Sequence, residues 1–129
     1  MAKGNLVWKP WADGMEVAVE MHIDGELKAH ILFDAATLED NIHMLAKARA
    51  GMKDQVTPKL EAGMRLEAIV DPAWQTEARH DAGGVMLALR HPGFGWVSFL
   101  LPQTEAQALG ASLTGLSEEL GAKSKPEES

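Results

Sequence analysis

The chain of 129 residues contains no cysteine and no tyrosine. Without cysteine it can form no disulfide, no thiolate metal site and no cysteine nucleophile. No apolar stretch approaches the roughly 18 residues that cross a bilayer, and residues 1–5 lack the apolar region of a signal peptide. These absences predict a cytoplasmic protein with no membrane-embedded part.

Positive charge is also scarce, with 12 lysine and arginine residues against 19 aspartate and glutamate residues, a formal net charge of −7. An acidic surface repels phosphate backbones, so nucleic acid is a disfavoured partner. One basic stretch opposes this trend and consists of His43, Lys47, Arg49, Lys53 and Lys59. It contains no aromatic residue on which a base could stack. Single-stranded nucleic-acid binding therefore stays open only as a minor alternative.

One order of signals occurs twice along the chain, at residues of about 4–51 and 63–117. Each copy has an apolar run, a Pro/Trp segment, an Asp/Gly turn, two alternating strands and an amphipathic helix. The repeat predicts an α+β fold of duplicated β-β-β-α units, with a mostly antiparallel sheet of about six strands and two helices packed on it. We expect a single domain over residues 1–120 and a disordered tail over 121–129.

The first hairpin is expected over residues 16–23 and 27–33, where the apolar residues of both strands occupy odd positions. Only a loop with an odd number of residues puts both apolar sets on one face. A three-residue loop, 23–25, with Gly25 in the left-handed conformation, satisfies this condition. The expected cross-strand pairs are Met21 with Leu27, Glu20 with Lys28, His22 with Glu26, and Ala18 with His30.

The second hairpin is expected over residues 85–91 and 96–101, joined by the loop 92–94, with Arg90 opposite Trp96. Unlike the first hairpin, it is apolar on both faces, whereas antiparallel sheets commonly expose one polar face to water. The additional apolar side chains are those of Met86, Ala88, Trp96 and Leu100. A helix, the N-terminal segment or a second subunit must cover them.

Three further elements complete the predicted fold. Residues 64–70 alternate as a half-buried strand, and a first helix begins near Thr37 and ends at Gly51. A second helix begins at Thr104, which has the capping-box spacing to Gln107. Its apolar stripe consists of Ala106, Leu109, Leu113, Leu116 and Leu120.

The long connection over residues 72–84 contains the weak catalytic candidates His80 and Asp81, because a carboxylate beside an imidazole can orient it as a base. An Asp before Ala-Gly-Gly is also a common turn former, and we favour that interpretation. Glu20, His22 and His30 share one strand face, which we interpret as solvated rather than metal-binding. We expect no metal and no cofactor.

The chain is predicted to be a small non-catalytic binding or protein-interaction module that forms a homodimer. Exposed tryptophan and arginine are typical of interface hot spots, and four tryptophans in this chain are notable beside the absence of tyrosine. The alternatives are a small-molecule enzyme that uses the His80-Asp81 loop and a single-stranded nucleic-acid binder. The expected ligand or interface residues are Trp74, Arg79, Met86, Arg90, Trp96 and Leu100.

Overall fold

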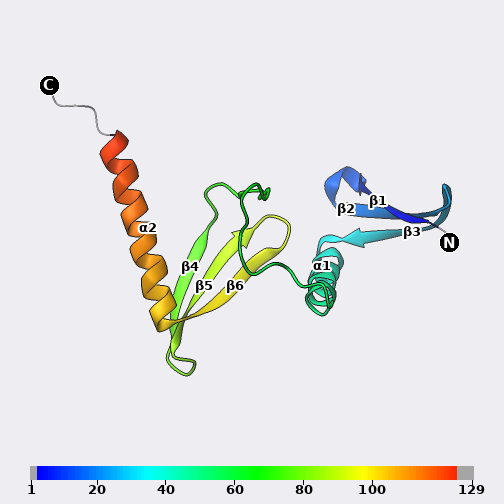
Figure 1. Ribbon diagram of the computed structural model, residues 1–129. Coiled ribbons are helices and arrows are strands. Elements are labelled where there is room, and N and C mark those ends of the chain that lie inside the picture. Colours follow the sequence, from blue (N-terminus) through cyan, green and yellow to red (C-terminus); the bar gives the residue numbers. More distant parts are fainter. Residues whose placement is uncertain (1–2, 125–129) are drawn as a thin grey trace. The chain divides into compact units, whose positions relative to one another are not determined.

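A computed structural model describes residues 3–124 of the chain and divides it into two compact units, Met1–Glu67 and Ala68–Ser129. Each unit consists of three antiparallel strands followed by one helix (Figure 1). The α+β class and the duplicated β-β-β-α arrangement are therefore confirmed. The six strands form two three-stranded sheets, each in sequence order, rather than one continuous sheet.

The first sheet has the order β1-β2-β3, with the middle strand β2 paired antiparallel to both neighbours. Proline lacks a backbone N–H and is confined to edge strands, so Pro10 fits its place in β1. The helix begins earlier than expected because the Asp34 carboxylate accepts a hydrogen bond from the Thr37 backbone N–H at 2.8 Å and caps it. The elements are β1 (Gly4–Trp11), the short 3-10 turn η1 (Ala12–Gly14), β2 (Glu16–Ile23), β3 (Glu26–Asp34) and α1 (Ala35–Ala50).

The first hairpin differs from its predicted register. Its turn is the two-residue segment Asp24-Gly25, with φ of 50° and 84°, the positive values that a type I′ turn requires. A bulge at Lys28 then brings the apolar residues of both strands onto one face, as the predicted three-residue loop would. Met21 therefore lies opposite Ala29 instead of Leu27. The odd residues share a face as predicted. The other three expected pairs are wrong, because Glu20 lies opposite His30, His22 opposite Leu27, and Ala18 opposite Leu32.

The second sheet has the order β4-β5-β6, and its second hairpin has the predicted register. The loop is 92–94, and Arg90 lies opposite Trp96. The predicted strand at residues 64–70 is wrong, because that segment is irregular and the third strand forms inside the expected loop 72–84. The elements are β4 (Trp74–Arg79), β5 (Gly84–His91), β6 (Gly95–Pro102) and α2 (Gln103–Ser124).

The second helix also differs from its predicted bounds. It begins at Gln103, so Thr104 lies inside it and is not its cap. It continues to Ser124, so residues 121–124 of the expected tail are helical. The remainder of that tail, residues 125–129, lies outside the described part of the chain.

The buried interior of each unit is small. Within residues 3–124, the buried hydrophobic residues are Ala18, Val19 and Ala88, all in the middle strands. The helices contact the strands that precede them, α1 contacting β3 and α2 contacting β5 and β6. Beyond these contacts α2 diverges from its sheet (Figure 1). Much apolar surface therefore stays open within each unit, and its position indicates where a function can lie.

Candidate interaction surface

One face of the second sheet carries most of the candidate residues. Side chains alternate between the faces of a strand, so the observed registers place Arg79, Met86, Arg90, Trp96 and Leu100 on the same side. We call this side the Trp96 face; its residues are Gln75, Glu77, Arg79, Met86, Ala88, Arg90, Trp96, Ser98 and Leu100. The remaining candidate, Trp74, lies on the opposite face, at the first residue of β4.

The middle of the Trp96 face is apolar and open. Ala88 is buried between its neighbours, but Trp96 is 51% exposed and Leu100 is 53% exposed. Monomeric proteins rarely leave contiguous apolar surface uncovered, and such patches mark interaction sites. Within the described residues, Gln103 at the start of α2 lies with Ala78 and Val85 of the opposite face, and Trp96 and Leu100 stay exposed.

The helix α2 has an uncovered apolar surface of its own. Its side chains Leu113 and Leu120 are 60% and 68% exposed, so the stripe predicted from the sequence does not pack on a sheet within its unit. We call it the leucine stripe; its residues are Leu109, Leu113, Leu116 and Leu120. One unit thus presents both an open sheet face and an open helix stripe.

Arg79 lies across the polar margin of the Trp96 face. Its Nε is 3.5 Å from a carboxylate oxygen of Glu77, and its guanidinium donates to the sulfur of Met86 at 3.3 Å. Arg90, opposite Trp96, makes no cation–π contact with that indole in the described residues. The face is therefore an apolar centre with two arginines and one carboxylate at its margin.

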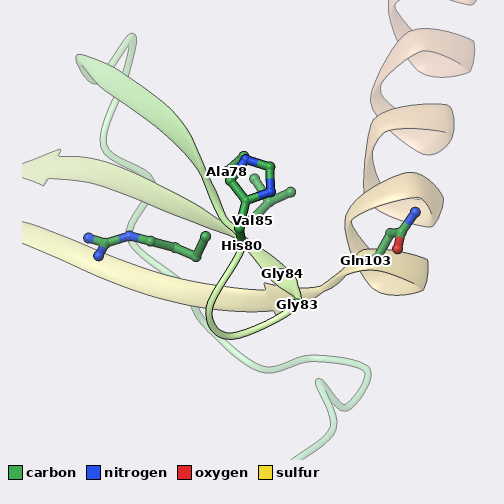
Figure 2. Close-up of a pocket in the computed structure, with 7 residues that line it drawn as sticks. Ala78, His80, Gly83, Gly84, Val85 and Gln103 are labelled. Atoms are coloured by element: carbon green, nitrogen blue, oxygen red, sulfur yellow. The ribbon is translucent and has the colours of Figure 1, made fainter.

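The catalytic candidates His80 and Asp81 lie in the turn between β4 and β5 but line different hollows. His80 lies beside Ala78 and Val85 in a hollow of about 340 Å³ that also includes Gln103, at the start of α2 (Figure 2). Asp81 lines a second hollow of about 350 Å³ together with Met86 and Leu100 of the Trp96 face. No hydrogen bond or ion pair joins His80 to Asp81 in the described residues, so the geometry gives a catalytic pair no support.

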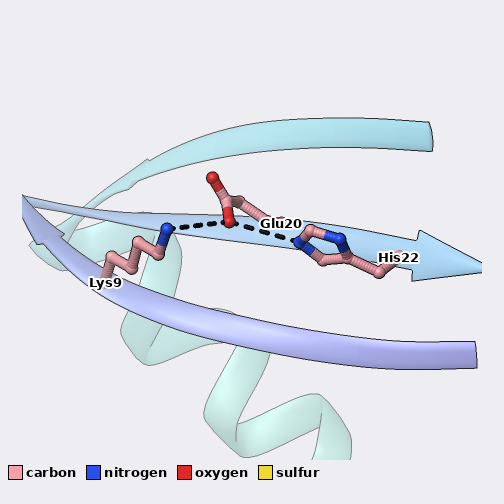
Figure 3. A network of polar contacts seen from close by, with 3 residues as sticks. All are labelled: Lys9, Glu20 and His22. Atoms are coloured by element: carbon pink, nitrogen blue, oxygen red, sulfur yellow. Dashed lines mark hydrogen bonds and ion pairs between the residues drawn. The ribbon is translucent and has the colours of Figure 1, made fainter. Parts of the chain in front are cut away.

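The corresponding face of the first sheet has a charged centre, and Trp11 and Leu32 on the same face are 51% and 42% exposed. Glu20 accepts from Lys9 Nζ at 3.0 Å and contacts His22 Nε2 at 3.3 Å (Figure 3). The hydrogen bonds from Lys9 and then from His22 hold the pKa of Glu20 below its usual value. Sequence reasoning missed Lys9 because it considered β2 and β3 without their neighbour β1. His30 instead makes an edge-on ring contact with Trp11, the ring centroids being 6.2 Å apart.

Within residues 3–124, no group of three or more His, Asp or Glu side chains is placed to hold a metal ion. The basic residues Lys47 and Arg49 belong to the last turns of α1, and Lys53 and Lys59 belong to the irregular segment that follows. The Arg49 guanidinium donates to the backbone carbonyl of Asp54, so this charge helps to hold the end of the helix.

Comparison with protein-family models, with curated proteins and with solved structures found no match to this chain. In the described residues, neither helix combines the length and the apolar character that crossing a membrane requires. The interpretation of the surface therefore depends on its own chemistry.

Proposed function

We propose that this protein is a non-catalytic interaction module that forms a homodimer, in which a second copy covers the Trp96 face. The observation that carries this proposal is the uncovered apolar centre of that face, where Trp96 and Leu100 are both more than half exposed. Tryptophan is strongly enriched among the residues that dominate binding energy. Water contact with this surface is unfavourable, and association removes it.

The occupant that fits best is supplied by the chain itself. A two-fold dimer is isologous, so the leucine stripe of each copy can cover the Trp96 face of the other. The dimensions are compatible: the stripe from Leu109 to Leu120 extends about 17 Å along the helix, and an eight-residue strand such as β6 is about 26 Å long. The exchange pairs two surfaces that neither copy covers alone.

Charge also favours a second copy at this position. The chain has a formal net charge of −7, so two copies repel each other in general. The Trp96 face carries the arginines Arg79 and Arg90 and the single carboxylate Glu77. Like-charge repulsion between two copies is therefore smaller at this face than over the rest of the acidic chain.

Sedimentation equilibrium at micromolar concentration tests the proposal, with the expected result of a dimer. Leu113→Glu puts a charge in the leucine stripe and should give a monomer. The control Ala111→Glu adds the same charge on the opposite side of α2, since two residues of an α-helix correspond to a rotation of about 200°. It should leave the dimer intact. A wild-type protein that stays monomeric at tens of micromolar would contradict the proposal.

A further inference from the structure

The strand β6 is an edge of the second sheet, and it is unlike the other three edges. Edge strands of natural proteins are protected from pairing by charged side chains, prolines and bulges. β1 contains Lys9 and Pro10, β3 has a bulge at Lys28, and β4 has the ion-paired Glu77 and Arg79. β6 is eight residues long, contains no charged residue, and has a proline only at its last position.

The backbone groups that β6 directs outward follow from one hydrogen bond. The Arg90 N–H donates to the Ala73 carbonyl at 2.9 Å, so Arg90 directs its backbone groups toward the β4 side of β5. In an antiparallel ladder successive residues alternate, so Leu89 faces β6 and forms the hydrogen-bonded pair with Val97.

The same alternation along β6 shows which residues direct their backbone groups away from β5, toward the free edge of the sheet. Val97, Phe99 and Leu101 direct their backbone groups inward to β5, and the residues between them point outward. The outward residues that have a backbone N–H are Trp96, Ser98 and Leu100. In residues 3–124, β6 pairs with β5 alone, so these three N–H groups and their carbonyls have no partner in the chain.

We propose that β6 pairs antiparallel with β6 of a second copy, around a two-fold axis at Ser98, to make a continuous six-stranded sheet. This inference rests on the proposed self-association and gives it a register. Ser98 lies opposite Ser98 of the second copy, and Trp96 lies opposite its Leu100. Each of the three outward residues enters a hydrogen-bonded pair with two bonds, about six new backbone hydrogen bonds in all.

Other registers are less favourable. Side-chain parity must be kept, because a shift by one residue would put apolar side chains of one copy beside the opposite face of the other. A shift of the axis to Phe99 puts Trp96 opposite Pro102, which has no N–H to donate. The Ser98 axis leaves Pro102 outside the ladder and also sets Val97 opposite Phe99, an aliphatic–aromatic pair of the type that stabilises sheets.

The pairing also places the start of each helix α2 near the second copy. In an antiparallel pair the end of one β6 lies beside the start of the other. Because α2 begins at Gln103, directly after β6, its first turn comes to the end of the second copy's strand where Trp96 lies.

Amide hydrogen exchange of the full chain tests this register. At dimer-forming concentration, the amides of Trp96, Ser98 and Leu100 should exchange roughly a hundredfold more slowly than the outward amides of Thr76 and Ala78 on the charged edge β4, because hydrogen-bonded amides exchange only through opening. Dilution to the monomer should remove that protection. A dimer whose three amides exchange as fast as those of Thr76 and Ala78 would overturn the register and leave the proposed self-association standing.

A proline at the axis supplies the second test. In Ser98→Pro the lost N–H points outward, so the β5–β6 ladder is kept while two bonds at the axis are removed. The matched control is Thr76→Pro, which removes an outward N–H from the middle of β4. We expect the Ser98→Pro variant to be monomeric and the control to be dimeric. If the two variants dimerise equally well, the proposed register is wrong. If the wild-type protein is monomeric, the proposed function is wrong as well. If Ser98→Pro does not fold, the hydrogen-exchange experiment decides.

Discussion

The two sheets have the same topology, but they present different surfaces to water. Glu20 pairs with His30 in the first sheet, and Ala88 pairs with Ser98 at the corresponding place in the second. The first of these faces carries the Lys9–Glu20 ion pair, while the second has an apolar centre. The two sheets therefore differ at the centre of this face, which is charged in the first sheet and apolar in the second. The difference favours the unit Ala68–Ser129 as the site of the proposed self-association.

The strongest test of this difference puts one charge at equivalent places on the two sheets. Leu100 and Leu32 both lie on the edge strand that leads into a helix, two residues before the strand ends. Leu100→Glu should raise the dimer dissociation constant roughly a hundredfold or more, because an unpaired charge in a buried interface costs about 3–5 kcal/mol. Sedimentation velocity over a concentration series measures it.

The matched variant Leu32→Glu adds the same charge beside the Glu20 network. It should leave the dissociation constant within a few-fold of the wild-type value. Equal weakening by the two substitutions would show that both sheets contribute to association, and the contrast between the units would fail.

A second test concerns folding rather than association. Val19 is 7% exposed at the centre of the first sheet, so Val19→Ala should lower the free energy of unfolding by about 2 kcal/mol through lost burial and a small cavity. Urea denaturation should give the same loss at every protein concentration. The control Val56→Ala, at a residue that is 67% exposed, should change nothing measurable. A concentration-dependent loss in Val19→Ala would mean that the first sheet also lies in the interface.

Side-chain parity predicted part of this architecture and could not predict the rest. The second hairpin has the predicted register, with the loop 92–94, one of the odd-numbered loops that satisfy parity. In the first hairpin, a two-residue turn followed by a bulge at Lys28 has the same parity as a three-residue loop. Parity fixes the face of a residue, but it does not separate registers that differ by two residues.

The strand β4 was missed for a different reason. Its sequence, WQTEAR, has little apolar alternation, because an edge strand is held mainly by backbone bonds to β5. In residues 64–70 apolar and polar residues alternate, but no strand of the described residues pairs with this segment. For the site, the sequence identified the excess apolar face, while the separation of His80 from Asp81 into different hollows required coordinates.

The polar face of the first sheet should respond to acid in a predictable direction. Its hydrogen bonds to Lys9 and His22 lower the pKa of Glu20 in the folded state. The stabilisation is therefore present above the pKa of the unfolded state and is lost as the pH falls through the lowered folded value. Glu20→Gln should be less stable than wild type near neutral pH, and the difference should vanish in acid.

A carboxyl-carbon NMR titration tests the cause directly. Lys9→Ala should raise the pKa of Glu20 toward its usual value, because it removes the largest contribution to the shift. Lys28→Ala removes a lysine that pairs with Glu26 at 2.8 Å and should leave the titration of Glu20 unchanged. If Lys28→Ala has the larger effect, general surface charge rather than the Lys9 hydrogen bond controls Glu20.

The smallest expected effect concerns the N-terminal capping of the two helices. The hydrogen bond from Thr37 caps α1 and lowers the pKa of Asp34, whereas Pro102, the residue before α2, has no side-chain acceptor. Asp34→Ala should lower the melting temperature by a few degrees and speed amide exchange in the first turn of α1 alone. Asp34→Asn should retain most of the cap, and Thr104→Ala should have no effect on α2, since Thr104 lies inside that helix.

As the pH falls through the lowered pKa of Asp34, the advantage of wild type over Asp34→Ala should shrink, because the protonated carboxyl is a weaker acceptor. A cap that kept its full effect in acid would assign the stabilisation to helix geometry rather than to the charge of Asp34.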